Sequence, residues 1–224
     1  MIISRTPYRI SLFGGGTDYP QWFDKNNGQV INASIDKYVY ISCRYLPPFF
    51  SHRLRIVYSR IELVKKAEQI LHPSVRAVLK FLNINEYIEM HYDGDLPSRS
   101  GMGSSSAFTV GILNVLSKYK NINLSKKKLA NQSIHIEQKI IKEIVGSQDQ
   151  ISVSYGGFNH IKFSKNKFEV KKINLHSDKL DELNNNLMLF HTGLFRTAET
   201  ISKKYVNKLY QKEKYLFTIY DLVF

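Results

Sequence analysis

The N-terminal half of the chain contains several segments in which apolar and polar residues alternate, the pattern of β-strands with one buried face. This pattern predicts strands over residues 2–13, 28–46, 52–58 and 86–93. The longest segment, 28–46, is rich in β-branched and aromatic residues and is compatible with one strand or two. Gly14-Gly15-Gly16 follows the first segment and predicts a turn there.

Apolar residues spaced three and four positions apart predict helices over residues 73–82, 104–119, 125–144 and 198–217. The 104–119 segment is apolar on nearly every side, so we expect this helix to be buried. Ser125 is suited to cap the helix that follows it. The inward positions of that helix would be Leu129, Ile136, Ile140 and Ile144.

The segments that follow predict a loop and further strands. Residues 146–150 read as a loop, residues 151–163 predict a hairpin that turns at Gly156-Gly157, and residues 187–192 predict a strand. A mixture of strands and helices in this order is typical of the α+β class. We expect two parts, a larger one over 1–165 and a smaller one over 166–224.

Composition narrows the range of partners. The chain has 32 Lys and Arg against 19 Asp and Glu, a net charge of +13. The basic residues are spread along the chain without a nucleic-acid-binding motif, so we expect a phosphorylated small molecule rather than a nucleic acid. No apolar run approaches the roughly 18–20 residues that cross a membrane, and the lone Cys43 excludes an internal disulfide. These features favour a cytoplasmic protein.

Residues 97–107, PSRSGMGSSSA, are the strongest candidate for chemistry. Gly101 and Gly103 can adopt a positive φ and allow the backbone to approach a ligand closely. Three serines then open the predicted helix, whose first N–H groups and dipole favour a phosphate. The spacing is neither that of a P-loop nor that of a dinucleotide fingerprint. Taken alone, the stretch fits a serine-capped helix equally well.

Two other loops accompany this stretch: PYRISLFGGGTD over residues 7–18 and GSQDQ over residues 146–150. In this order the three motifs resemble the GHMP kinases, a family that includes galactokinase, homoserine kinase and mevalonate kinase. The family signature P-x-x-x-G-L-G-S-S-A is met here with Met102 for the leucine and Ser106 for the alanine. GGGTD, IHIEQ and YGGFNHI are similar to the branch that phosphorylates sugars or sugar phosphates, notably the heptose 7-phosphate kinases.

The resemblance implies a kinase that uses ATP and Mg²⁺. Asp149 would orient the substrate hydroxyl or accept its proton, and Arg9 would stabilise charge in the transition state. Glu137 and the Ser105 hydroxyl would hold Mg²⁺. The ATP phosphates would be bound by Pro97, Gly101, Met102, Gly103, Ser104, Ser105 and Ser106. The sugar would be bound by Gly15, Gly16, Thr17, Asp18 and Arg196.

Each of these residues also has a purely structural interpretation. Arg9 lies between apolar neighbours on a predicted strand and could pair with an aspartate for stability alone. Asp149 could bond its own backbone, and Glu137 could be an ordinary solvated helix residue. Thr17 and Asp18 could form a tight turn with an aspartate cap, and Arg196 could be a surface arginine.

The family resemblance therefore implies a GHMP kinase-like N-terminal domain followed by a partial second α+β domain. The implied reaction is phosphoryl transfer to a sugar or sugar phosphate, with a heptose 7-phosphate, in the synthesis of surface polysaccharide precursors, as the specific expectation. A third glycine-rich motif is expected in this family, but Gly193 is the last glycine of the chain. A truncated, non-catalytic homologue that binds a sugar or a protein partner is therefore the alternative. We also expect an exposed apolar patch that a partner or a second copy would cover.

Overall fold

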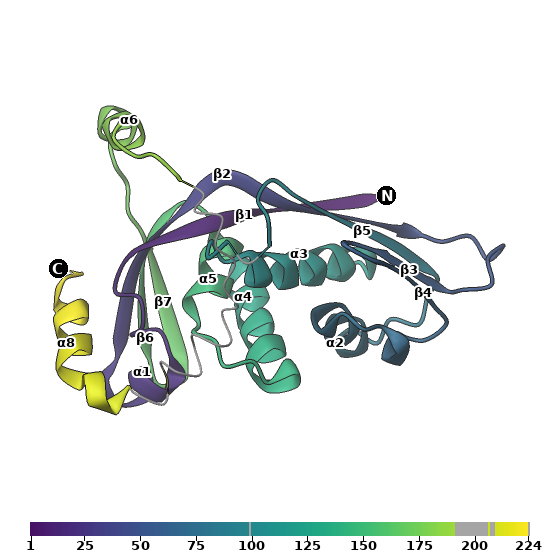
Figure 1. Cartoon of the computed structure of the whole chain (residues 1–224), viewed down its shortest axis with the longest axis horizontal. Helices are drawn as coiled ribbons and strands as arrows, with labels where there is room; N and C mark the ends of the chain where they lie inside the picture. The colour runs from purple at the N-terminus through teal and green to yellow at the C-terminus, as the bar shows by residue number, and fades with distance from the viewer. Residues whose placement is uncertain (99, 191–205, 207–208, 224) are drawn as a thin grey trace.

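The computed structural model describes residues 1–98, 100–190, 206 and 209–223. Figure 1 shows a long, bent sheet with several helices gathered along one side of it. The described strands are β1 (Ile2–Phe13), β2 (Gly28–Tyr45), β3 (Leu54–Val57), β4 (Ile61–Val64), β5 (Ile88–Gly94), β6 (Phe158–Ser164) and β7 (Lys167–Lys172).

The described helices alternate with these strands along the chain. The α-helices are α1 (Pro20–Asn26), α2 (Pro73–Phe81), α3 (Ser104–Tyr119), α4 (Lys126–His135), α5 (Gln148–Tyr155), α6 (Ser177–Asn185) and α8 (Glu213–Asp221). Three short helical segments complete them: η1 (Ala67–Gln69), the π-helix η2 (Ile136–Ile141) and η3 (Tyr210–Lys212). This mixture confirms the α+β class.

The sheet is organised around β2, whose 18 residues pair with three other strands. Along one edge β2 pairs antiparallel with β1, and Ile2 lies opposite Cys43. Along the other edge, residues 39–45 of β2 pair with β5 and residues 28–33 pair with β6. The resulting strand order is β4-β3-β5-β2-β6-β7. The β1–β2 register shifts between Pro7 and Arg9. Such a shift re-aims the side chains that follow it, and here it lies beside the candidate site.

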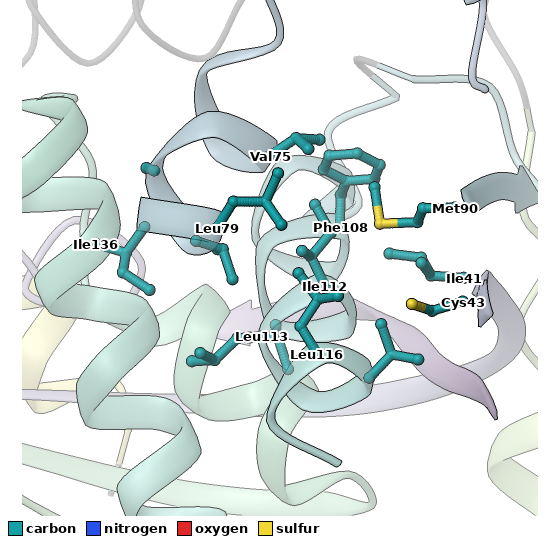
Figure 2. Close-up of a cluster of buried hydrophobic side chains, with 14 of the residues drawn as sticks. Ile41, Cys43, Val75, Leu79, Met90, Phe108, Ile112, Leu113, Leu116 and Ile136 are labelled. Atoms are coloured by element: carbon teal, nitrogen blue, oxygen red, sulfur yellow. The ribbon is translucent and has the colours of Figure 1, made fainter. Parts of the chain in front are cut away.

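Helix α3 lies against the sheet and forms the centre of the larger hydrophobic core. Figure 2 shows its side chains between those of α2 on one side and those of β2 and β5 on the other. Gly111 permits this close packing, because a Cβ there would lie 3.0 Å from Ile41 Cδ1 and 3.1 Å from Thr6 Oγ1. The cluster drawn in Figure 2 includes Ile41, Cys43, Val75, Leu79, Met90, Phe108, Ile112, Leu113, Leu116 and Ile136.

A second, smaller core joins α1 and α8 to the other end of the sheet. Trp22 and Phe23 of α1 are buried there together with residues of β2, β6 and α8. The rings of Trp22 and Phe217 meet edge to face at 5.2 Å, and Gln29 Nε2 donates to the Tyr220 carbonyl at 2.9 Å. These contacts hold α8 against the N-terminal part of the chain.

Most of the expected elements are present, and Ser125 caps α4 by accepting a hydrogen bond from the Lys128 amide at 3.3 Å. Helix α3 has the expected bounds, and eleven of its sixteen residues are buried. The long helix expected over 125–144 is different: it is α-helical to His135 and then widens into η2. Within η2, Ile140 is 41% exposed and does not face the core.

The hairpin expected over 151–163 is wrong. Residues 148–155 form α5, and Gly156 ends this helix with φ 66° instead of turning a hairpin. Ile151 and Val153 suggest a strand by alternation, but Ser152 between them and the preceding Gln150 are buried as well, as in a helix packed on several sides. The actual hairpin joins β6 to β7, with Ser164 opposite Lys167.

Several other segments depart from expectation. Helix α1, strands β4 and β7 and helix α6 were not expected, because they are short or strongly charged. Residues 187–190 have no regular secondary structure, and the rest of the strand expected over 187–192 lies outside the described residues. The helix expected over 198–217 overlaps the described chain only in its last part, where η3 and the start of α8 lie.

Two further findings concern the surface. Residues 187–190 form an exposed apolar run, in which Met188 is 81% and Phe190 75% exposed. Whether a partner or a second copy covers this run stays a prediction. Among the described residues, the structure contains no helix with the length and apolar character of a membrane span.

Candidate active site

The glycine-serine loop, residues 100–106 leading into α3, contacts both the backbone and the side chain of Arg9 on β1. The Arg9 amide donates to the Met102 carbonyl at 3.1 Å, and Arg9 Nη1 donates to the Gly101 carbonyl at 2.9 Å. Gly101 and Gly103 have φ of 78° and 73°, as the sequence predicts. A Cβ on Gly103 would lie 3.2 Å from Arg9 Cγ. Gly103 is therefore needed both for its backbone conformation and for the space that Arg9 occupies.

The first turn of α3 receives no cap from the side chain of its N-cap residue. Gly103 stands at the N-cap position and has no side-chain oxygen with which to cap the first N–H groups. Those groups and the helix dipole favour a negatively charged ligand. At this end of α3, Ser105 is exposed whereas Ser106 is buried. Pro97, at the start of the loop, is exposed.

Arg9 forms an ion pair with Asp149 at the start of α5. Nη2 and Nε of Arg9 lie 2.6 and 2.8 Å from Asp149 Oδ1. The two side chains are 11% and 27% exposed, so the pair is shielded but can be reached from solvent. Both contacts use Oδ1. Arg9 and Asp149, which are 140 positions apart in the chain, thus meet next to the glycine-serine loop.

Glu137 lies buried behind this loop, at the start of η2. Its side chain accepts hydrogen bonds from the Ser106 hydroxyl, at 3.0 Å, and from the Gln150 amide. Both bonds end on Oε2. The buried Oε1 has no partner with ordinary hydrogen-bond geometry, although the Thr109 hydroxyl interacts with the carboxylate and lowers its pKa. Burial raises the pKa of Glu137 to about 7, since a charged carboxylate is poorly solvated there.

A buried carboxylate oxygen without a partner of ordinary hydrogen-bond geometry, next to a helix N-terminus, fits a hard divalent cation, which takes oxygen ligands. The hydroxyl in contact with Glu137 is that of Ser106, and the sequence had suggested the neighbouring Ser105. Within the described chain there is no cluster of three or more His, Cys, Asp or Glu side chains that would hold a metal alone. Phosphate oxygens or water would therefore complete the coordination.

The Gly14–Asp18 turn lies next to the start of α5. The Thr17 hydroxyl is buried. It lies 2.8 Å from the Gly14 carbonyl oxygen and 2.9 Å from the Gln29 carbonyl oxygen, either of which can accept its proton. It accepts a hydrogen bond from the Gln29 amide at 3.0 Å. Asp18 is 1% exposed, and burial and the nearby Asp149 carboxylate raise its pKa to about 6. Gly15 is exposed and Gly16 partly exposed. The accessible part of this turn is therefore its glycine backbone.

The structure thus brings Arg9, Asp149, Glu137, the glycine-serine loop and the Gly14–Asp18 turn into one region. Arg196 lies outside the described residues. Sequence reasoning missed three polar residues of the region: Ser11, Gln148 and Gln150. The Ser11 hydroxyl donates to Gln148 Oε1 at 2.9 Å, and Gln150 contacts Glu137. The two glutamines flank Asp149 in GSQDQ, and that position beside a candidate catalytic residue was the available signal.

Comparison with known proteins agrees with this geometry. Residues 62–157 match the family model described as the GHMP kinases N terminal domain. The match includes the glycine-serine loop, Glu137 and Asp149. Arg9 and the Gly14–Asp18 turn lie before the matched range but are joined to it by the contacts above.

Two relatives illustrate the similarity of sequence. The chain is 30% identical over 220 residues to D-glycero-alpha-D-manno-heptose 7-phosphate kinase of Campylobacter jejuni, which covers 93% of this chain and 64% of the relative. It is 28% identical over 173 residues to galactokinase of Pyrococcus furiosus, covering 72% of this chain and 46% of the relative. The chain thus spans less than two thirds of the length of these relatives.

Solved structures show the same fold. The crystal structure of a D-glycero-D-manno-heptose 1-phosphate kinase from Bacteroides thetaiotaomicron superimposes with a TM-score of 0.78 at 22% identity, over 97% of this chain and 74% of that one. Lactococcus lactis galactokinase, solved with galactose, superimposes with a TM-score of 0.58 at 18% identity, over 96% of this chain and 70% of that one.

Proposed function

We propose that this chain, whose residues 62–157 match the GHMP kinases N terminal domain, transfers the γ-phosphoryl group of ATP to a hydroxyl of a sugar or sugar phosphate. The observation that carries the proposal is the Arg9–Asp149 ion pair beneath the glycine-serine loop. It places a cation and a carboxylate next to the helix end that is best suited to bind phosphate.

Asp149 and Arg9 have complementary roles in the proposed reaction. The Asp149 carboxylate orients the substrate hydroxyl and accepts its proton as the oxygen attacks phosphorus. Oδ1 is held by Arg9, so Oδ2 is the oxygen left for the substrate. Arg9 keeps Asp149 in place and stabilises the negative charge that spreads over the transferred group.

The glycine-serine loop and Glu137 form the phosphate end of the proposed site. Residues 101–106 bind the ATP phosphates through backbone N–H groups and serine hydroxyls, with Pro97 setting the start of the loop. Glu137, through Oε1, and the Ser105 hydroxyl would hold Mg²⁺. When bound, Mg²⁺ neutralises charge on the phosphates.

The sugar end of the proposed site is the Gly14–Asp18 turn. The backbone of Gly15 and Gly16 is accessible, and a Cβ on Gly15 would lie 3.9 Å from Gln148 Nε2. Thr17 and Asp18 stabilise this turn through hydrogen bonds within it. Arg196 is proposed to bind a substrate phosphate. The positive net charge of +13 favours the encounter with phosphorylated ligands. The chain is proposed to act in the cytoplasm.

The proposed specific substrate is a heptose 7-phosphate, phosphorylated at its anomeric hydroxyl. Two observations support it: the GGGTD motif and the 30% identity to the Campylobacter jejuni heptose 7-phosphate kinase. Galactokinases share less of the chain, 72% for the one from Pyrococcus furiosus.

The test is ATP consumption with a panel of sugars and sugar phosphates, including heptose 7-phosphate and galactose. Asp149→Asn removes the carboxylate but keeps its shape, and we expect a loss of about 10²–10⁴-fold in kcat. Asp178→Asn is the matched control, because Asp178 is 84% exposed on α6, which Figure 1 shows projecting away from α3 and α5; its activity should equal that of the parent.

Two results would count against the proposal. Unchanged turnover in Asp149→Asn would overturn the role of that residue. A parent chain that binds ATP·Mg²⁺ in calorimetry but turns over none of the panel would favour the non-catalytic alternative.

A further inference from the structure

Gln150 links the first turn of α5 to the buried carboxylate of Glu137. Gln150 is fully buried, and its Nε2 donates a hydrogen bond to Glu137 Oε2. The two residues lie 13 positions apart, Glu137 on η2 and Gln150 on α5. Burying a side-chain amide is costly unless it forms hydrogen bonds. The contact with Glu137 therefore explains why a polar side chain stands at this buried position.

The groups that hold the Glu137 carboxylate are neutral. The Ser106 hydroxyl donates to Oε2 from α3 at 3.0 Å, and the Gln150 amide donates to the same oxygen from α5. The Thr109 hydroxyl, also on α3, interacts with the carboxylate as well. Neutral donors orient a carboxylate without cancelling its charge, so the charge remains available to a cation. A lysine or arginine in place of Gln150 would compete with that cation.

Gln138, the neighbour of Glu137, makes the reverse connection. Its Nε2 donates to the Val145 carbonyl and to Ser147 Oγ, both at 3.1 Å. Ser147 directly precedes α5. Two glutamines, one on each side, therefore join η2 to the start of α5. This second contact is independent evidence that the two elements are fixed relative to each other.

Asp149 and Gln150 are consecutive residues that serve opposite ends of the candidate site. Asp149, which is 27% exposed, forms the ion pair with Arg9 at the end where the substrate hydroxyl would lie. Gln150 points instead to Glu137, at the end where the phosphates and the metal would lie. One turn of α5 thus contacts both ends, and a shift of this turn would change both.

We propose that Gln150 is a positioning residue for the metal end of the site. It fixes the Glu137 carboxylate by holding Oε2, so that Oε1 is the oxygen left for Mg²⁺, and it contacts neither the metal nor the sugar itself. Because it belongs to the same helical turn as Asp149, it also sets the two carboxylates relative to each other. This inference rests on the proposed kinase activity, since it assigns Gln150 a role in that reaction.

The kinetic test measures how turnover depends on free Mg²⁺ at a constant ATP concentration. Gln150→Met keeps a side chain of similar size but removes the donor. We expect the Mg²⁺ concentration for half-maximal turnover to rise about 10–100-fold, the range for residues that orient a metal ligand, while the KM for the sugar changes little. An unchanged Mg²⁺ requirement would overturn the inference, because a residue that only supports α5 would lower kcat without affecting that requirement.

Two further variants sharpen this test. Gln148→Met is the matched control, because Gln148 is the other neighbour of Asp149 but contacts Ser11 instead of Glu137. It should leave the Mg²⁺ requirement unchanged, whatever it does to kcat, and a rise equal to that of Gln150→Met would contradict the inference. Gln150→Asn keeps an amide but withdraws it from Glu137 by one methylene, and it should raise the Mg²⁺ requirement as Gln150→Met does.

A second test does not depend on turnover. Thermal unfolding is measured with a chelator present for Gln150→Met, Glu137→Met and the double variant. We expect Gln150→Met to lower Tm in the parent, where it deprives the Glu137 carboxylate of a donor, but not in the Glu137→Met background, where the amide has no carboxylate to hold. An equal loss of Tm in both backgrounds would overturn the contact on which the inference rests. This cycle can be read even if no sugar is turned over, so failure of the proposed activity and failure of the inference are distinguishable.

Discussion

At the scale of single residues, the protonation state of Glu137 depends strongly on the fold. Its pKa is raised from 4.5 to about 7 by burial. A raised pKa means that the folded state holds the proton more tightly than the unfolded state. The contribution to stability is therefore complete below about pH 4.5 and is lost as the pH rises through about 7.

We expect Glu137→Gln to remove this loss. With a chelator present, the free energy of unfolding of the parent should fall relative to that of the variant between pH 5 and pH 8, by at most about 3 kcal/mol. Urea unfolding at the two pH values measures the difference. Added Mg²⁺ should stabilise the parent at pH 8 and leave the variant unaffected. A difference between variant and parent that is the same at both pH values would contradict the assigned burial.

Gly103 is a second residue whose role can be isolated. Gly103→Ala places a side chain at φ 73°, which costs about 1–2 kcal/mol, and brings it 3.2 Å from Arg9 Cγ. Gly157→Ala has a similar φ, 81°, but nothing within 4 Å of the new Cβ. We expect both variants to lose similar stability in urea unfolding, and only Gly103→Ala to lose activity in the ATP assay. Equal activity in the two variants would argue against contact between the loop and Arg9.

At the scale of elements, α3 and η2 differ sharply in how their apolar residues are used. Leu113 on α3 is fully buried, whereas Ile140 on η2 is 41% exposed. Leu113→Ala should therefore cost about 2–5 kcal/mol of unfolding free energy. Ile140→Ala should cost much less, because it removes little buried surface. Urea unfolding of both variants measures this difference in unfolding free energy. Similar losses of unfolding free energy in the two variants would show that Ile140 packs in the core.

The same elements show what can be predicted from sequence. β1 and α3 have the expected bounds, because their alternation and their apolar spacing are uninterrupted over twelve and sixteen residues. α5 is only eight residues long and is buried on several sides, so its apolar pattern does not reveal its period. The π-helix that starts at Ile136 widens an otherwise regular helix, and Ile140 is turned out of the core as a result.

The candidate site likewise contains residues that motifs predict and residues that only the fold brings together. Arg9, Glu137, Asp149 and the glycine-serine loop were expected from motifs, and the structure brings them together. Ser11, Gln148 and Gln150 were not, because their partners are distant in sequence and only the fold brings them close. For Asp18, the motif left sugar binding and turn capping open. The burial of Asp18 and its closeness to Gly146 come from the fold and cannot be read from the sequence.

At the scale of the whole molecule, one long sheet and the helices packed against it position the described part of the candidate site. β1 carries Arg9 and Ser11, α3 begins at the glycine-serine loop, and α5 begins at Asp149's turn; all three meet along the same region of the sheet (Figure 1). Because the large core around α3 and the smaller core around α1 lie on either side of this region, both contribute to its geometry.

The most direct test of this account follows the phosphoryl group itself. The chain is incubated with γ-³²P-labelled ATP, Mg²⁺ and heptose 7-phosphate, and the products are separated. We predict label in the sugar product for the parent and for Asp178→Asn, and at least about 10²-fold less for Asp149→Asn. Equal labelling of the sugar by Asp149→Asn, or label from the parent appearing only as inorganic phosphate, would contradict it.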